Sequence, residues 1–201
     1  MEFFVLAVLI AVVAFLLKSK DSSRRIALLG RHLGQYQIEK LMESLTEGYQ
    51  RALGESDEER RAQIWHLLDS TESKLSEQFN SFAAEFSTVD EREARVSKLP
   101  IAIPFADKLL PDATFDLRKL LLVHAQGISD AAKNSGQRTP KGKAFAMSAE
   151  LYLMQHSCHW FCKSRAVASA RLQMRHKTSY AQLLESVPAD TRRAYGVLVG
   201  N

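Results

Sequence analysis

An uninterrupted apolar run from Phe3 to Leu17 constrains this chain more than any other feature. Its fifteen residues span roughly 22 Å as a helix, which is short of the ~30 Å hydrocarbon core of a bilayer. The snorkelling stems of Lys18 and Lys20 lengthen the effective span. A cleavable signal peptide is the alternative, but acidic Glu2 stands where a basic region would lie, and no small-x-small cleavage site follows before Lys18. We therefore predict that residues 1–20 form a transmembrane anchor.

The charges that flank this run predict its orientation. All the basic residues near it follow it in the chain: Lys18, Lys20, Arg24, Arg25 and Arg31. By the positive-inside rule, the N-terminus lies outside and residues 18–201 lie in the cytoplasm. The two cysteines are too few for a disulfide framework and suit a reducing compartment. The sequence thus predicts a single-pass protein of the inner (plasma) membrane.

After the anchor, the apolar residues recur at helical spacing and no strand-like alternation lasts. Two such stripes, over residues 26–52 and 64–86, are separated by Gly54. Ser56 and Glu59 have the spacing of a capping box, which predicts that the second helix begins there. Two long helices joined by a short turn form an antiparallel hairpin.

The second half of the chain is also predicted to be helical, after an irregular connection. Three prolines in twelve residues place that connection at residues 99–115. Thr139 as N-cap and Pro140 as first helical residue are a strong start signal. No helix breaker follows until Pro188, so we expect one long helix or two, and then a short helix that ends near Leu198.

These patterns predict an all-α fold: a helical bundle of about five to seven cytoplasmic helices on a single N-terminal transmembrane helix. The expected organisation is an anchor over residues 1–20 and a cytoplasmic α-helical domain over residues 21–201. The domain comprises an acidic hairpin at 24–99, a proline-rich connection at 99–115 and a basic half at 116–201.

Charge is distributed unevenly over the domain. Residues 24–100 carry 11 Lys and Arg against 14 Asp and Glu, whereas residues 101–201 carry 14 against 7. Such an asymmetry indicates an anionic partner surface: lipid headgroups, an acidic protein or nucleic acid. Nucleic acid is disfavoured, because aromatic residues do not interleave the basic ones and no helix-turn-helix signature occurs.

Basic residues in two segments are the candidates for partner or lipid contact. Tethering already holds the domain near the leaflet, where each Lys or Arg contributes about 1 kcal/mol to binding of anionic lipid. A solvated helix face is the simpler interpretation of the same charges. The candidate contact residues are Arg138, Lys141, Lys143, Lys163, Arg165, Arg171, Arg175 and Lys177.

The segment "MQHSCHWFCKSR", residues 154–165, contains both cysteines and two histidines. On a helix, Cys158 and Cys162 fall on an apolar arc, which favours cysteines buried in the core and histidines that are packed and hydrogen-bonded. The alternative is a zinc site formed by Cys158, His159 and Cys162 with His124 from the preceding helix. Zinc pairs usually lie on turns, so we expect no cofactor and keep zinc as the alternative. Redox chemistry is disfavoured because no Cys-x-x-Cys occurs.

No enzyme signature was found, and we predict no catalytic residue. Glu-x-x-His, His-Glu-x-x-His and Gly-x-Ser-x-Gly are absent, and "GQRTPKGKAF" (residues 136–145) departs from a phosphate-binding loop in spacing and context. Catalytic groups can be scattered along a chain, so these absences favour binding over catalysis without excluding an enzyme. We expect a membrane-anchored interaction or scaffold protein, accessory to a membrane-associated complex, with a protein partner at the bilayer. The alternatives are a metal-binding membrane protein and a homo-oligomer formed through the stalk.

Overall fold

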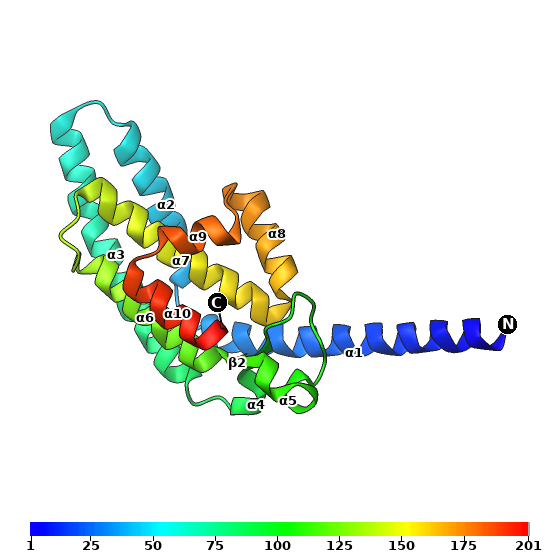
Figure 1. Ribbon diagram of the computed structural model, residues 1–201. Helices are drawn as coiled ribbons and strands as arrows, with labels where there is room; N and C mark the ends of the chain where they lie inside the picture. The colour runs from blue at the N-terminus through cyan, green and yellow to red at the C-terminus, as the bar shows by residue number, and fades with distance from the viewer. Residues whose placement is uncertain (201) are drawn as a thin grey trace.

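The computed structural model describes residues 1–200, in which one long helix carries a helical body at its C-terminal end (Figure 1). Helix α1 (Glu2–Leu33) is continuous, so no break separates the apolar run from the body. Its C-terminal half packs against α3 and α7, while its apolar half is fully exposed. This is a helix long and apolar enough to cross a membrane, with a mean hydropathy of 2.3 over 18 residues.

Helices α2 (Ile38–Gly54) and α3 (Glu58–Phe86) form the predicted antiparallel hairpin, but the first predicted helix is too long, because residues 26–33 belong to α1. The predicted capping box is wrong by one position. Asp57 is the N-cap of α3, and its carboxylate accepts a hydrogen bond of 2.9 Å from the backbone amide of Arg60. An ionised carboxylate at the positive end of a helix is a stronger acceptor than the hydroxyl of Ser56.

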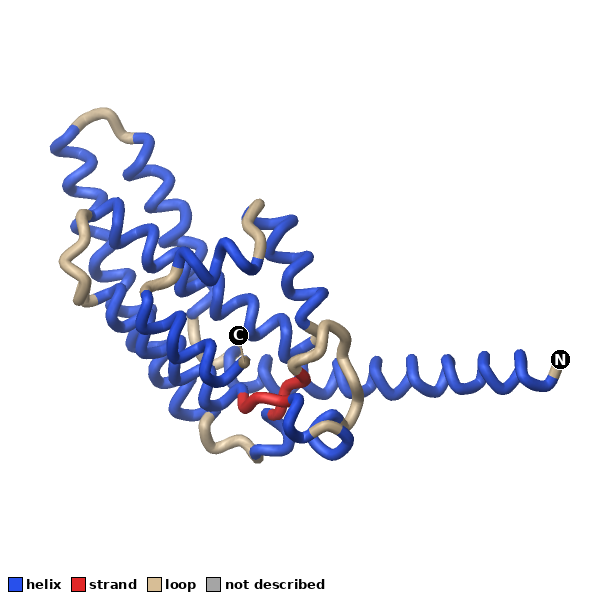
Figure 2. Tube along the Cα trace, viewed as in Figure 1, coloured by secondary structure: helices blue, strands red, loops and turns tan. Residues whose placement is uncertain are grey.

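A short two-stranded ribbon that the sequence did not predict brings the two ends of the connection together (Figure 2). Its strands are antiparallel, with Arg95 opposite Asp116. The indole of Trp160 covers the ribbon: it donates a hydrogen bond of 2.8 Å to the carbonyl oxygen of Ser97 and packs edge-on against Phe115. The elements here are α4 (Glu91–Ala94), β1 (Arg95–Ser97), α5 (Ala106–Leu109), the 3-10 turn η1 (Pro111–Ala113) and β2 (Thr114–Asp116).

The remaining elements are helices α6 (Leu117–Ala132), α7 (Pro140–Cys162), α8 (Arg165–His176), α9 (Tyr180–Ser186) and α10 (Ala189–Val199). The predicted start of α7 is confirmed, since the hydroxyl of Thr139 accepts from the amide of Gly142. Within residues 1–200, nine α-helices follow α1, more than the five to seven predicted. Short α4, α5 and α9, and the break where Ser164 caps α8, account for the difference.

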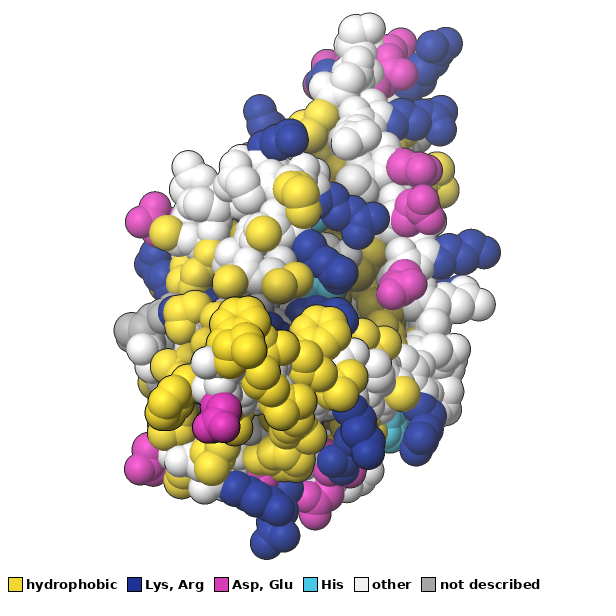
Figure 3. All heavy atoms as spheres, turned by 90° about the vertical axis from the view of Figure 1, so that its right-hand side faces the viewer, with side chains coloured by type: hydrophobic (Ala, Val, Ile, Leu, Met, Phe, Trp, Pro, Cys, Tyr) yellow, Lys and Arg dark blue, Asp and Glu magenta, His cyan; other side chains and the backbone are white. Residues whose placement is uncertain are grey.

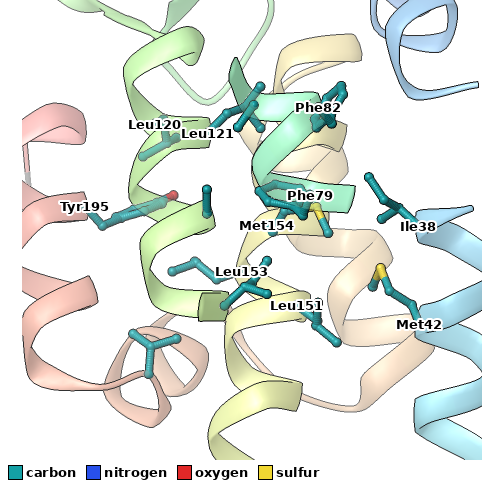
Figure 4. Close-up of a cluster of buried hydrophobic side chains, with 14 of the residues drawn as sticks. Ile38, Met42, Phe79, Phe82, Leu120, Leu121, Leu151, Leu153, Met154 and Tyr195 are labelled. Carbon is teal, nitrogen blue, oxygen red and sulfur yellow. The ribbon is translucent and has the colours of Figure 1, made fainter. Parts of the chain in front are cut away.

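Helix α7 is the centre of the body, and α1, α2, α6, α8 and α9 all pack against it. The close-up in Figure 4 shows side chains of α3, α6 and α7 meeting in the core, with Ile38 and Met42 of α2 on one side and Tyr195 of α10 on the other. The buried histidine His156 stacks on Tyr180 and hydrogen-bonds Ser169 at 3.0 Å, as a packed core histidine should. Because α7 is held by neighbouring helices on most sides, the side chains on its uncovered face have fixed positions.

Candidate functional site

The uncovered face of α7 forms the floor of a groove of about 800 Å³. Met154, Cys158 and Cys162 of α7 lie in this floor, and Ile26 and Leu29 of α1 continue it. Helices α2 and α8 supply the two walls. A smaller recess of about 360 Å³ shares several of these residues and extends beneath α8. We call the two together the α2–α8 groove.

The groove opens beside α1, on the side of the body from which that helix projects. Figure 3 looks along α1 toward the body and shows a recess with basic and histidine side chains on one side and acidic side chains on the other. The basic wall contains Arg171 and Arg175 of α8. The opposite wall contains one lysine, Lys40, but is acidic overall, because Glu39, Glu43 and Glu47 are spaced four residues apart along α2. The groove therefore has an apolar floor and walls of opposite charge.

The walls of the groove are charged because α8 and α2 are amphipathic helices that turn their apolar faces toward other helices. Helix α8 turns Ala168 and Leu172 onto α7, which leaves Arg171 and Arg175 exposed. Helix α2 turns most of its apolar stripe onto α3, so that only its edge reaches α7. Helices α2 and α8 each pack against α7 and not closely against each other, so a groove remains between them.

The histidines of the groove are neutral near pH 7. Burial, followed by the positive charges of Arg171 and Arg175, lowers the pKa of His159 below its usual range. Burial and the charge of Arg175 do the same to the pKa of His176, whose ring stacks on Tyr152 with 3.8 Å between centroids. The positive charge of this wall thus comes from the two arginines.

The two cysteines are half-buried: they pack against the core, as their helical arc predicted, and they also line the floor of the groove. Burial, with the neighbouring Cys162, raises the pKa of the Cys158 thiol to about 12. Burial raises the pKa of Cys162 to about 11, against the opposing charge of Arg25. Both thiols are protonated at neutral pH, which makes them poor nucleophiles. They act as small apolar side chains of the floor.

The predicted metal set is not brought together. His124 does not line the groove: it is fully buried, its Nε2 lies 2.9 Å from the hydroxyl of Ser157, and its ring faces Tyr195. Nowhere in residues 1–200 do three or more His, Cys, Asp or Glu side chains stand where they could hold a metal ion. The geometry therefore gives the zinc hypothesis no support.

The candidate basic residues separate into two groups, one between the end of α7 and the end of α8 and the other at the start of α7. Arg171 and Arg175 line the groove, and Lys163 lies close to α1, in a small cavity that Lys18 also lines. The guanidinium of Arg165 lies over the ring of Trp160 at 5.6 Å. The exposed residue Lys177 ends α8.

The second group, Arg138, Lys141 and Lys143, lies at the start of α7, away from the groove. Lys141 is exposed and Arg138 is half-buried. Lys143 is not available for a partner: its ammonium lies 2.5 Å from Glu72 and 2.7 Å from Asp69, and only 12% of its side chain is exposed. We correct its predicted role, because this lysine neutralises a buried carboxylate.

Sequence reasoning missed the α1 and α2 residues of the groove. A signal was present in α2, since Glu39, Glu43 and Glu47 share one helix face by their spacing of four. The spacing alone did not indicate a binding site, because the sequence does not show that α8 lies opposite this face.

Comparison of the chain with protein-family models, curated proteins and solved structures gave no match.

Proposed function

We propose that this protein is a single-pass inner-membrane protein whose cytoplasmic helical body binds a partner and serves as a scaffold or accessory subunit of a membrane-associated complex. The α2–α8 groove is its binding site. The observation that carries the proposal is the position of that groove, which has an apolar floor, charged walls and an opening beside the helix that anchors the protein.

The bonding of α1 to the body supports an anchor over a leader that is removed. The Ser22 hydroxyl donates to the carbonyl oxygen of Cys162 at 2.8 Å, and Arg25 donates to the carbonyl oxygen of Arg95 at 2.9 Å. Leu29 of the same helix is buried in the core. The apolar run is therefore a stiff extension of the body, and the basic residues from Lys18 onward favour a cytoplasmic body.

The groove lies close to the membrane surface in this arrangement. Ile26, part of its floor, follows Lys20 by six residues, which is about 9 Å along a helix. A partner segment in the groove would thus lie just beneath the headgroups. Other proteins of the same membrane have segments at this distance from the bilayer, so they are the most suitable partners.

We further propose that the occupant is an amphipathic helix of a partner membrane protein. Helices bind in grooves of this kind by placing an apolar face on the floor. Acidic residues along one edge of that helix would pair with Arg171 and Arg175, and basic residues along the other edge with the glutamates of α2. Walls of opposite charge fix the orientation of the bound helix and reject helices of the wrong polarity.

Reversing the charge of the basic wall is expected to release the partner. In Arg171→Glu/Arg175→Glu, like charges face the acidic edge of the bound helix, at a cost of about 2 kcal/mol or more, so partner recovery should fall at least ~30-fold. Recovery is measured by quantitative mass spectrometry after crosslinking in cells and purification of the full-length protein in mild detergent.

The matched control is Arg192→Glu/Arg193→Glu, a double reversal of exposed residues on α10. This control should retain the partner at the wild-type level. Equal recovery with both double variants, or equal loss, would show that the basic wall is not the contact surface.

A further inference from the structure

Four large apolar side chains are exposed within the proline-rich connection. Ile101 is 61% exposed, Phe105 52%, Leu109 65% and Leu110 41%. Single exposed apolar residues are common on soluble proteins, but four within ten positions form a patch that marks a contact surface. We call residues 101–110 the apolar collar.

The collar lies beside α1 at the level where the apolar run ends. Ile101 lines a small cavity together with Lys18 and Ser22, and Phe105 lines another together with Arg25. Figure 1 shows that this part of the body reaches furthest along α1 toward its N-terminus. In Figure 3, hydrophobic side chains gather around the end-on α1 on this same face.

One exposed residue of the collar has a strained backbone conformation. Phe105 has a left-handed conformation, with φ 58° and ψ 30°. Bulky residues rarely adopt it, and they retain it only where the surroundings compensate the strain. Lys108 extends its ammonium over the Phe105 ring at 5.9 Å, so that a cation accompanies the exposed aromatic. This combination of an aromatic ring, aliphatic side chains and a lysine suits the interface between lipid headgroups and acyl chains.

The length of the anchor also indicates that the collar contacts the bilayer. Residues 3–17 form a helix of roughly 22 Å, shorter than a ~30 Å hydrocarbon core, and a short span draws its flanking residues toward the bilayer. The flanking residues here are attached to the body through Ser22 and Arg25. The collar is therefore pulled toward the leaflet from which α1 emerges.

We propose that the apolar collar is a second, interfacial membrane contact, which inserts Ile101, Phe105, Leu109 and Leu110 into the leaflet that α1 crosses. The inference rests on the anchoring part of the proposed function. Asp107 offsets the charge of Lys108, so the collar has no net charge, and its insertion is driven by apolar burial and persists at high salt. Contact at both α1 and the collar fixes the angle of the body, and with it the direction in which the α2–α8 groove opens.

Three matched Phe→Trp substitutions in the full-length protein test this. Phe15 lies on α1, Phe105 in the collar and Phe145, 59% exposed, near the start of α7. Each variant is reconstituted into phosphatidylcholine–phosphatidylglycerol vesicles with or without brominated acyl chains, and the signal of native Trp65 and Trp160 is subtracted. Phe105→Trp should show at least twofold quenching in 0.5 M salt, strongest with bromines near the headgroup, whereas Phe145→Trp should show none.

The pattern of quenching separates the two proposals. Quenching of Phe15→Trp without quenching of Phe105→Trp overturns the collar contact and leaves the anchor standing. No quenching of Phe15→Trp overturns the anchor and the collar together. Adding Leu109→Glu to Phe105→Trp should reduce the quenching at constant thermal stability, because both side chains are exposed; unchanged quenching would contradict insertion of the collar as a unit.

Discussion

Full-length protein that carries Leu9→Arg and Ile10→Arg should almost completely leave the membrane fraction. Both residues lie at the middle of the apolar run and are exposed, 57% and 62%, so the changes remove no contact with the body. An arginine at the centre of a span costs about 2.5–3.5 kcal/mol, while leucine and isoleucine each contribute about −0.5 kcal/mol. The double change should therefore disfavour insertion by about 6–8 kcal/mol, or more than 10⁴-fold.

Carbonate extraction of isolated membranes measures this effect, because it removes peripheral proteins and leaves integral ones. Wild-type protein should stay in the pellet with an intact mass of 22.6 kDa, which also excludes removal of a leader. The control is Leu67→Arg/Phe145→Arg, which places two arginines at exposed apolar positions of the body. It should remain in the pellet like the wild type. A Leu9→Arg/Ile10→Arg protein that resists extraction would refute a single span through α1.

Lys143→Met should lower the free energy of unfolding by about 3–5 kcal/mol, because it leaves a buried carboxylate without its counter-ion. Glu72 is 2% exposed; one carboxylate oxygen accepts from the Tyr49 hydroxyl at 2.5 Å and the other faces the Lys143 ammonium at 2.5 Å. For a chain of this size the change corresponds to a fall in Tm of about 10 °C. Thermal unfolding of the full-length protein in detergent, followed by circular dichroism, measures it.

Two further variants isolate the cause of this loss. Lys141→Met removes an exposed lysine two positions away and should change stability by less than about 0.5 kcal/mol. Glu72→Gln/Lys143→Met removes both charges and keeps an acceptor for Tyr49, so it should recover most of the stability. Similar losses for Lys141→Met and Lys143→Met, or no recovery in the double variant, would contradict an unpaired Glu72 carboxylate as the cause.

The sequence predicted those elements that are determined by interactions between residues close together in the chain. The apolar run of α1, the α2–α3 hairpin and the start of α7 at Thr139 all depend on hydrophobic period or capping chemistry within a few residues. The β1–β2 ribbon could not be predicted in this way. Its strands of three residues are too short to show a period, and Trp160, more than forty residues away in the chain, covers them.

The candidate site was predicted only in part, because it depends on how distant helices are placed. Helical spacing correctly grouped Arg171 with Arg175 and Cys158 with Cys162. A helical arc shows which residues share a face but not whether another helix covers that face, so the contact of the cysteines with the groove was not predicted. Lys143 was expected at the surface because its partners, Glu72 and Asp69, lie about seventy positions earlier.

Photocrosslinking from inside the α2–α8 groove tests the central claim most directly. Benzoylphenylalanine replaces Gln155, which lines both recesses of the groove, and in a second variant Val197, which is 82% exposed on α10. Illumination of cells should link position 155, but not 197, to one membrane protein, through an amphipathic peptide next to a membrane span. Adding Arg171→Glu/Arg175→Glu should abolish that product. Crosslinks from position 155 to lipid alone, or to the same proteins as position 197, would contradict a partner helix in the groove.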